Sequence, residues 1–313
     1  MNKALKNPLI MFKSPGIGDL QIILSNIHRI SKEVNKPVSI LAQKNTRAKS
    51  VFKHDPHIDE VIDLEQKDFF RIISKIKSKN FNQCYIYSDS VRLWLIAKLA
   101  GISKIYHYPF FSKRGKNFYK TAKKFTEEIL QKKIDSTSKI YWNRDEIEKT
   151  KKKYDIKDNV KNIICGISAS GPTKRWGIDN YIKLFEKINS KFTCKFFLAG
   201  GESDENLIRR VMGSFNNCVS LSKLNIEQII PIVASCQIYL GNDTGFGHLA
   251  ANLNSKCLMI FCDSPPSAYG LWNPNIKIIV PSGETIESCG HNTRGKDKIS
   301  FDEVLKKSLD LIN

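Results

Sequence analysis

Short apolar runs alternate with amphipathic segments along almost the whole chain, and this alternation constrains the fold more than any other feature. The runs predicted to be strands cover residues 9–13, 38–41, 83–87, 104–108, 163–166, 195–199, 238–241, 256–261 and 276–280. The segments predicted to be helices cover residues 19–32, 69–79, 90–100, 178–188, 204–212, 225–234 and 246–253. Because most of these strands are continuous apolar runs that alternate with helices, they predict an α/β fold of parallel sheets covered by helices on both faces.

The alternation is interrupted once, between residues 110 and 160, where the sequence is charge-rich, compatible with helix and without a convincing strand. It restarts at the apolar run that begins at Ile163. With 313 residues the chain also exceeds the usual domain size of roughly 100–150 residues. We therefore expect two doubly wound domains, residues 1–157 and 158–313, with packing of the last helix back on the N-terminal domain as an alternative. Such domains bind ligands in a crevice at the carboxyl ends of their strands.

The net charge of +19, from 50 Lys and Arg against 31 Asp and Glu residues, is concentrated in the first half. Residues 1–150 hold 29 basic and 15 acidic side chains, or +14, against 21 and 16, or +5, in residues 151–313. The densest stretch, Lys98 to Lys153, includes the pairs Lys113-Arg114, Lys123-Lys124 and Lys132-Lys133. Such a surplus attracts nucleic acid, anionic lipid or a phosphorylated substrate, and lysines on solvated faces explain it equally well. Lysine outnumbers the arginine that reads bases, and no nucleic-acid-binding motif occurs, so we expect no specific nucleic acid partner.

No apolar run reaches the roughly 20 residues of a membrane span. The N-terminal run Leu9-Ile10-Met11-Phe12 is also shorter than the core of a signal peptide, about 7–15 residues. We therefore expect a cytoplasmic protein. The eight cysteines form no C-x-x-C pair and several lie inside apolar runs, which predicts buried, reduced thiols rather than disulfides or a structural zinc.

Two glycines and an aspartate follow the first predicted strand, in the sequence Ser14-Pro15-Gly16-Ile17-Gly18-Asp19. Gly16 and Gly18 allow a sharp turn with room for a ligand close to the backbone, and Asp19 falls near the start of a helix. By itself Asp19 is more often a helix N-cap than a functional carboxylate. A dinucleotide fingerprint is incomplete, because Gln21 stands where the third glycine of G-x-G-x-x-G is expected.

A second loop, S-A-S-G-P-T-K-R-W over residues 168–176, follows the first strand of the second half. Small hydroxyl residues, a glycine and the adjacent cations Lys174 and Arg175 suit a phosphate-bearing ligand. The G-x-x-x-x-G-K-[ST] pattern of a Walker loop does not occur. The alternative is a basic surface loop in which Trp176 is a packing anchor.

A third loop, Gly200-Gly201-Glu202, also ends a predicted strand, and its carboxylate could bind ribose hydroxyls. A plain turn into a helix with an acidic first turn explains it equally well.

The fourth motif, L-G-N-D-T-G-F-G-H over residues 240–248, ends a strand and leads through a glycine-containing turn into a helix. Backbone N–H groups at that helix start would bind a diphosphate, because they lack intrahelical partners and lie at the positive end of the helix dipole. Asp243 could accept hydrogen bonds from sugar hydroxyls. His248 alone is more often a packed or capping histidine than a catalytic one.

Together these motifs resemble glycosyltransferase family 9, the ADP-heptose:lipopolysaccharide heptosyltransferase family. The resemblance rests on Gly18-Asp19, on Lys174-Arg175-Trp176 and on N-D-T-G-x-x-H-L-A-A at residues 242–251. It implies a GT-B fold, in which two Rossmann-like doubly wound domains face each other across a cleft. The first would bind the acceptor and the second the nucleotide sugar. It also implies inverting transfer without metal or cofactor, with heptose from ADP-heptose as donor and a lipopolysaccharide core-type acceptor.

Carried onto this sequence, the resemblance implies that Asp19 is the catalytic base, on an acceptor-side loop with Gly16 and Gly18. Lys174 would offset the charge that develops on the leaving diphosphate. These roles agree with elementary chemistry, since an attacking hydroxyl needs a base and a leaving diphosphate needs positive charge. No Asp-x-Asp pair occurs, which fits a mechanism without a bound divalent ion. The +14 of the first half fits an anionic glycolipid acceptor and peripheral contact with an anionic inner membrane surface.

The resemblance also implies a set of donor-binding groups. These are the phosphate contacts Ser170 and the amides of Thr244 and Gly245, the ribose-binding carboxylate Glu202, and the sugar-binding Asp243 with His248 as its support. The chain departs from the family in three places: the first helix lacks a proline, Gly177 replaces a common proline, and residues 166–170 lack a histidine. Another nucleotide sugar or glycan acceptor, or a non-catalytic sugar-nucleotide-binding protein, are therefore the alternatives.

Overall fold

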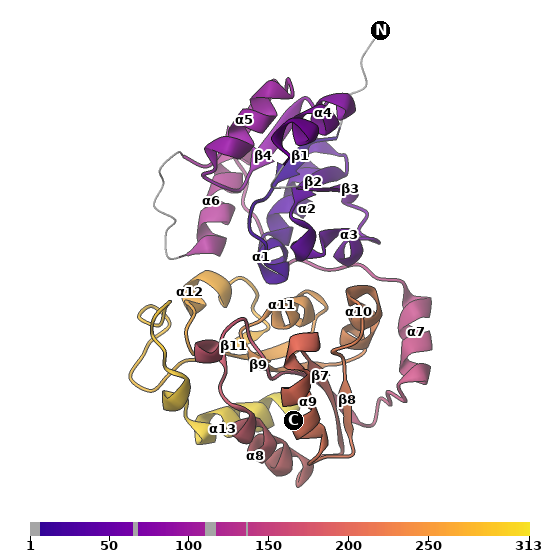
Figure 1. Cartoon of the computed structure of the whole chain (residues 1–313), viewed down its shortest axis with the longest axis vertical. Coiled ribbons are helices and arrows are strands. Elements are labelled where there is room, and N and C mark those ends of the chain that lie inside the picture. Colours follow the sequence, from indigo (N-terminus) through magenta and orange to yellow (C-terminus); the bar gives the residue numbers. More distant parts are fainter. Residues whose placement is uncertain (1–6, 65–67, 110–116, 136) are drawn as a thin grey trace. The chain divides into compact units, whose positions relative to one another are not determined.

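The computed structural model describes residues 7–64, 68–109, 117–135 and 137–313, and the chain divides between Tyr141 and Trp142 into two units (Figure 1). Each unit is built on one parallel β-sheet, which confirms the α/β prediction.

The first unit contains five parallel strands in the order β3-β2-β1-β4-β5. They are β1 (Leu9–Met11), β2 (Val38–Ala42), β3 (Ile58–Asp63), β4 (Gln83–Ile86) and β5 (Lys104–His107). The helices are α1 (Ile17–Ile22), α2 (Leu24–Val34), α3 (Ala48–Val51), α4 (Phe69–Lys79), α5 (Val91–Leu99) and α6 (Phe118–Leu130), with the 3-10 turn η1 (Lys44–Thr46). Apolar side chains of α4 and α5 pack on one face of this sheet. Helices α2 and α6 contact each other, and the right-handed crossover from β1 to β2 places α2 on the other face.

The second unit contains six parallel strands in the order β11-β10-β9-β6-β7-β8. They are β6 (Lys161–Gly166), β7 (Cys194–Ala199), β8 (Cys218–Ser220), β9 (Ile238–Asn242), β10 (Lys256–Ile260) and β11 (Ile276–Ile279). The helices are α7 (Arg144–Lys153), α8 (Ile178–Asn189), α9 (Glu205–Met212), α10 (Ile226–Ala234), α11 (Gly245–Asn252), α12 (Pro266–Tyr269) and α13 (Phe301–Ile312). Three 3-10 turns complete it: η2 (Pro172–Lys174), η3 (Glu202–Asp204) and η4 (Lys296–Lys298). Helices α8, α9 and α13 supply side chains to one core cluster, while α10 and α11 contact each other.

Both sheets reverse their strand order beside the first strand of the unit, between β1 and β4 and between β6 and β9. At such a switch point the loops after two neighbouring strands diverge to opposite faces, which leaves a crevice for ligands at the carboxyl edge. The glycine-containing loops singled out in the sequence follow β1, β6, β7 and β9. The topology therefore brings the last three loops to one edge of the second sheet.

All nine predicted strands are present, and two further strands, β3 and β8, were not predicted. Both lie at an edge of their sheet. Strand β3 has the sequence IDEVID with only Ile62 buried, and β8 has three half-buried residues, so neither contains the continuous apolar run that marks a central strand. The single helix predicted over residues 19–32 is divided into α1 and α2 at Ile23, whose ψ of 6° interrupts the helix.

The boundary predicted at residue 157 lies too far along the chain, because the units divide between Tyr141 and Trp142. Helix α7 contacts α10, which places it in the second unit. The charge-rich sequence of α7 has no buried residue and thus no apolar signal of where it packs. The last helix, α13, contributes Val304, Leu311 and Ile312 to the core of the second unit, so the alternative that it packs on the first domain is wrong.

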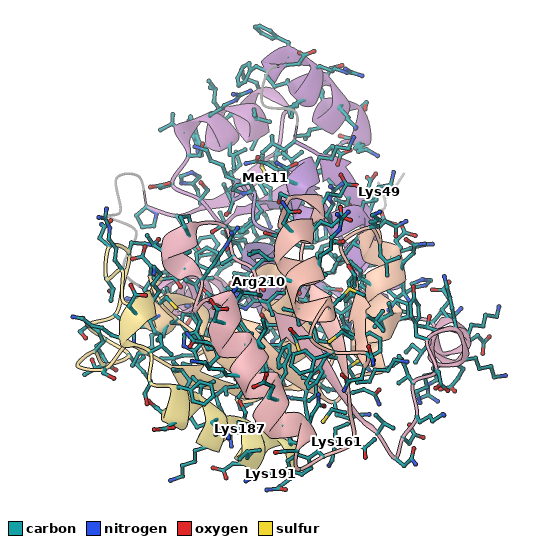
Figure 2. All side chains as sticks on the ribbon, turned by 60° about the horizontal axis from the view of Figure 1, so that its bottom comes forward. Met11, Lys49, Lys161, Lys187, Lys191 and Arg210 are labelled. Atoms are coloured by element: carbon teal, nitrogen blue, oxygen red, sulfur yellow. The ribbon has the colours of Figure 1, made fainter. Side chains whose placement is uncertain are left out.

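The remaining composition-based predictions concern cysteines, lysines and membrane spans. All eight cysteines are free and seven are buried, as expected, and burial raises the pKa of the Cys84 thiol to about 12. Lysines such as Lys49, Lys187 and Lys191 are exposed, whereas Met11 is fully buried (Figure 2). Within the described ranges, no helix combines the length and apolar character needed to cross a membrane.

Two glycines at the switch point of the second sheet allow β6 and β9 to approach closely. Gly166 and Gly241 are paired across the two strands. A Cβ atom on Gly241 would lie 2.5 Å from the backbone N of Gly166, and one on Gly166 would lie 1.9 Å from the hydroxyl of Tyr239. Neither backbone can move away without breaking the sheet, so both positions require glycine.

We expect Gly241→Ala to destabilise the second unit by about 3 kcal/mol, which lowers the melting temperature by roughly 6–12 °C. Differential scanning calorimetry measures this directly. The control is Gly171→Ala, because a Cβ there meets no atom within 4 Å and the φ of −159° suits any residue. Equal melting temperatures for the two variants would contradict the packing argument.

Candidate functional site

Asn242, the last residue of β9, joins the two loops that flank the switch point. It is fully buried. Its Oδ1 accepts a hydrogen bond from the backbone N of Trp176 at 3.0 Å, and its Nδ2 donates to the carbonyl of Ser168 at 3.3 Å. Asn242 therefore holds the loop after β6 against the end of β9, a structural role that the sequence analysis did not assign.

Arg175 forms the second connection, between the loops after β6 and β7. Its guanidinium donates to the carbonyl of Ala169 and, through Nη2, to Oδ1 of Asp204 at 3.3 Å. The other carboxylate oxygen of Asp204 accepts from the backbone N of Gly201 at 3.0 Å. The two adjacent cations of the sequence motif therefore differ in role. Arg175 hydrogen-bonds to Ala169 and Asp204 within the protein, so of the two cations Lys174 is the one that could bind a ligand.

Asp263, in the loop after β10, anchors the turn that contains Lys174. Its carboxylate accepts from the hydroxyl of Thr173 at 2.6 Å and from the backbone N of Arg294 at 2.9 Å. Burial by itself would raise the pKa of Asp263. The Thr173 hydroxyl, the backbone N–H groups of Arg294 and Asn292 and the charge of Lys174 more than offset burial and lower that pKa. Asp263 is therefore an ionised group that fixes the position of the Lys174 turn.

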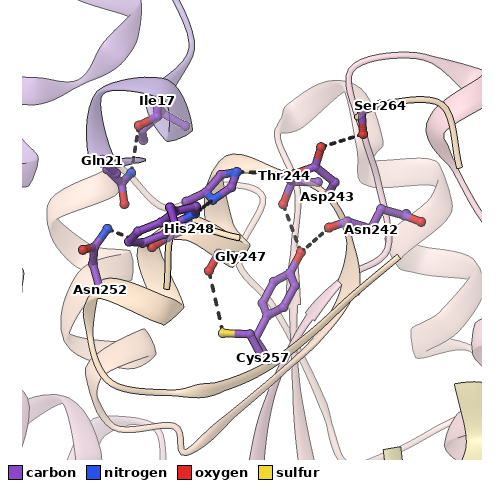
Figure 3. A network of polar contacts seen from close by, with 12 residues as sticks. Ile17, Gln21, Asn242, Asp243, Thr244, Gly247, His248, Asn252, Cys257 and Ser264 are labelled. Carbon is purple, nitrogen blue, oxygen red and sulfur yellow. Dashed lines mark hydrogen bonds and ion pairs between the residues drawn. The ribbon is translucent and has the colours of Figure 1, made fainter. Parts of the chain in front are cut away.

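Asp243, the first residue after β9, is held by two partners (Figure 3). Its Oδ2 accepts from the hydroxyl of Ser264 at 2.7 Å, and its Oδ1 lies 3.3 Å from Nε2 of His248. On the far side of the ring, Nδ1 of His248 accepts from the indole N–H of the fully buried Trp272 at 3.1 Å. An indole N–H only donates, so Nδ1 carries no proton and the Nε2 proton of His248 is directed to Asp243.

The start of α11 presents backbone N–H groups, whereas the Thr244 hydroxyl is used internally. The buried Tyr239 hydroxyl donates to the carbonyl of Asn242 at 2.7 Å and contacts the Thr244 hydroxyl at 3.0 Å, which must then be the donor. Thr244 is the N-cap, so the backbone amides of Gly245 and Phe246 are the first of the helix. Neither amide has a helical carbonyl four residues earlier to which it could donate a hydrogen bond. These amides, at the positive end of the helix dipole, suit an anion.

Ser170 and Glu202 lie on the same edge of the second sheet, in the loops after β6 and β7. Both residues are exposed, and neither side chain hydrogen-bonds to another residue of the described chain. Their hydroxyl and carboxylate are therefore accessible to a ligand. The described ranges contain no group of three His, Cys, Asp or Glu side chains placed to hold a metal ion.

Asp19 belongs to the first unit, in the loop and helix that follow β1 at its switch point. Gly16 is the N-cap of α1 and Asp19 is the third helical residue, so the alternative that Asp19 is an N-cap is wrong. The Ser14 hydroxyl donates to the Asp19 carboxylate. A Cβ on Gly16 would lie 2.9 Å from that carboxylate, while Gly18 is buried inside α1.

The second unit therefore brings together Lys174, Ser170, Glu202, Asp243, Thr244, Gly245 and His248, all on one edge of one sheet. The supporting residues Asp263, Ser264 and Trp272 were not predicted. Asp263 lies 90 positions from Thr173, Ser264 lies 21 from Asp243 and Trp272 lies 24 from His248, and single polar residues beside apolar runs give no signal of such pairing.

The model of glycosyltransferase family 9 (heptosyltransferase) matches residues 70–299, which is more than half of the chain. This chain belongs to glycosyltransferase family 9. Lipopolysaccharide heptosyltransferase 1 of Campylobacter coli is 22% identical to it over 94% of this chain and 93% of that protein. Lipooligosaccharide heptosyltransferase 2 of Haemophilus ducreyi is 30% identical over 39% of this chain and 38% of that protein.

Solved structures of family 9 proteins share the fold. The family 9 glycosyl transferase of Veillonella parvula matches with a TM-score of 0.81 and 15% identity, over 100% of this chain and 98% of that one. E. coli ADP-heptose lps heptosyltransferase II matches with a TM-score of 0.76 and 16% identity, over 98% of both chains. The two parallel-sheet units are accordingly those of a GT-B fold, and this family 9 member is a glycosyltransferase.

We expect Trp272→Phe to change the tautomer of His248, because the variant loses the N–H that keeps Nδ1 unprotonated. Nitrogen-15 NMR of labelled histidine should show an Nε2-protonated His248 in the wild type and a mixture of tautomers in the variant. The matched control is Trp176→Phe, since the buried Nε1 of Trp176 has no hydrogen-bond partner in the described chain. An unchanged His248 spectrum in Trp272→Phe would show that the indole N–H of Trp272 does not set the tautomer of His248.

Proposed function

We propose that this family 9 glycosyltransferase moves heptose from ADP-heptose to a lipopolysaccharide core-type acceptor, by an inverting reaction that needs no metal ion. The observation that supports it best is the placement of Asp243, held by Ser264 and His248, beside the free amides of α11 at a switch point. The names of the relatives support the donor and acceptor, as does the E. coli heptosyltransferase WaaC with ADP, a chain that matches with a TM-score of 0.74 and 13% identity over 98% of this chain.

The diphosphate would lie at the start of α11. The amides of Thr244 and Gly245 would donate to its oxygens, Ser170 would add a hydroxyl, and Lys174 would supply a full positive charge. Because Asp263 holds the Lys174 turn, this cation is positioned before the reaction begins. Positive charge from Lys174 and a helix N-terminus is what a leaving diphosphate requires in place of a metal ion.

Sugar recognition would rest on carboxylates. Glu202, exposed and without a side-chain partner in the described chain, would accept from the ribose hydroxyls. Asp243 would accept from hydroxyls of the transferred sugar, since His248 and Ser264 orient its two oxygens and leave further lone pairs. A carboxylate fixed by two donors discriminates between sugars better than a mobile one.

In the transfer step the acceptor hydroxyl would attack the anomeric carbon from the face opposite the diphosphate. The new C–O bond forms as the bond to the diphosphate oxygen breaks, so the configuration inverts and ADP leaves with that electron pair. Asp19 would take the hydroxyl proton as general base. In this proposal the first unit, with Gly16 and Gly18 in its β1 loop, binds the acceptor and the second binds the nucleotide sugar. An anionic glycolipid acceptor would place the protein in the cytoplasm at the inner membrane, with no specific nucleic acid partner.

We expect Asp19→Asn to lower kcat by about 10²–10⁴, because the amide cannot accept the proton. Affinity for ADP should stay within about threefold, since the base does not contact the donor in this scheme. Transfer is measured as ADP release with acceptor present. The control is Asp135→Asn, an exposed carboxylate of the same unit, which should keep full activity. An Asp19→Asn enzyme with most of its activity would remove Asp19 from the mechanism.

We expect ADP to raise the melting temperature of the wild type without added metal, and UDP and GDP to raise it less. Asp243→Ala should weaken ADP-heptose binding by about 10- to 100-fold, the cost of losing hydrogen bonds to a charged group, and ADP binding by no more than about threefold. Calorimetric titration with ADP-heptose and with ADP measures the two losses of affinity separately. A larger shift with UDP or GDP would reassign the nucleotide, and equal losses in Asp243→Ala would refute the sugar contact. No shift with any nucleotide would favour a protein that does not use a nucleotide sugar.

A further inference from the structure

Large exposed apolar side chains gather on two neighbouring helices of the first unit. Of the six in the described part of the chain, four lie on α4 or α5: Phe70 (79% exposed), Val91 (54%), Leu95 (39%) and Leu99 (50%). The two helices contact each other, as Figure 1 also shows. Single exposed apolar residues are ordinary, but a group of them on adjoining helices marks a binding surface.

Helix α5 has an outward face that is apolar along its length. Only Arg92 and Lys98 among its nine residues are polar. Val91, Leu95 and Leu99 recur at every fourth position, so with roughly 100° per residue they form one stripe. In the same projection Lys98 borders one side of the stripe and Arg92 the other, each about 20° beyond it.

The bordering cations lie over aromatic rings. Nζ of Lys98 is 6.0 Å from the ring centre of Trp94, and the guanidinium carbon of Arg92 is 5.8 Å from that of Phe69 on α4. The ring of Phe69 in turn contacts Phe70, at 5.5 Å between centroids. The cations, the aromatic rings and the apolar stripe therefore form one continuous surface across α4 and α5.

The charge of this surface has a single sign. Neither helix contains an acidic residue, and together they contain six basic ones: Arg71, Lys75, Lys77, Lys79, Arg92 and Lys98. Of the neighbouring acids, Glu60 pairs with Lys79 at 2.7 Å, and Asp68 precedes α4 and caps it by accepting from the backbone N of Arg71.

The basic stretch singled out in the sequence is different. Its lysines on and near α6 pair with glutamates, Lys123 with Glu127 at 3.9 Å, Lys124 with Glu128 at 3.7 Å and Lys132 with Glu33 at 2.6 Å. Lys113-Arg114 lies outside the described residues. Local pairing reduces the pull of α6 on a polyanion, whereas Lys75, Lys77 and Lys98 form no ion pair within the described part of the chain, so charge favours α4 and α5.

We propose that the α4–α5 surface, formed by Phe70, Val91, Leu95, Leu99 and the six basic residues, docks the protein on an anionic phospholipid bilayer. Exposed apolar side chains enter the headgroup region while lysines and arginines around them bind anionic headgroups. A stripe of apolar residues bordered by cations, with no acid on either helix, matches that chemistry. A protein partner would instead present localised carboxylates and a shaped apolar pocket.

The surface begins at the edge of the sheet that carries the Asp19 loop. In a parallel sheet each following helix starts at the carboxyl edge, and Phe70 and Val91 lie in the first turns of α4 and α5. Strand β4, which leads into α5, pairs with β1, which leads into the Asp19 loop. Docking here would bring a membrane-anchored acceptor to the acceptor side of the first unit, a consequence that rests on the proposed function.

The test is flotation of the whole protein with vesicles of phosphatidylglycerol and phosphatidylcholine, against vesicles of phosphatidylcholine alone. We expect binding to the anionic vesicles that weakens as salt is added. The triple variant Phe70→Ser, Leu95→Ser, Leu99→Ser should lose about tenfold or more in partition coefficient, and Lys75→Gln, Lys77→Gln, Lys98→Gln should lose at least as much. The matched control Lys123→Gln, Lys124→Gln, Lys132→Gln removes the same charge from the α6 region and should bind like the wild type.

Unchanged binding of the serine variant, or an equal loss in the α6 control, would overturn the assignment. A wild-type dimer that the serine variant converts to monomer, by sedimentation without vesicles, would assign the face to a second copy instead. Because the vesicles contain neither donor nor acceptor, flotation is independent of the proposed reaction. Transfer to a lipid-free saccharide should be unchanged in the serine variant, so a failure of the proposed function is recognised separately.

Discussion

The close approach of β6 and β9 at the switch point of the second sheet is the contact on which the rest of the site depends. Gly166 and Gly241 allow the two backbones to meet, and Asn242 then hydrogen-bonds to both ends of the loop after β6. Since Asp243 follows Asn242 directly, the same contact sets the start of α11 and the position of the Asp243 carboxylate. A rigid strand end thereby positions groups from three loops.

The electrostatics of the site depend on which charged side chains form hydrogen bonds within the protein. Asp204 and Asp263 are buried. Asp204 accepts a hydrogen bond from Arg175 and Asp263 accepts one from Thr173, so both carboxylates hold loops in place instead of binding a ligand. Lys174 and the amides of α11 remain to meet an anion, and Glu202 remains exposed. The protein separates the groups that hold the edge together from those that meet a ligand, although both kinds alternate in the sequence.

Much of this could be predicted from local patterns. Nine of the eleven strands in the described ranges were predicted because each is dominated by apolar residues, and the site loops because glycines and polar residues follow such runs. Strands β3 and β8 were missed because β3 alternates acidic with apolar residues and β8 has only three half-buried residues, which edge positions tolerate. The unit boundary was misplaced because α7 carries no apolar stripe to show which sheet it accompanies.

The sequence by itself determined the α/β class, the order of the elements and the identity of the chemical groups, because these depend on periodicity and on residues close together in the chain. Only the tertiary structure decided which groups are available. It showed that Arg175 is committed to Asp204, that Trp272 sets the tautomer of His248, and that the Thr244 hydroxyl is directed inward. These are contacts between residues on different elements, and hydrogen bonds of that kind are fixed by the packing of whole strands and helices, which no local pattern records.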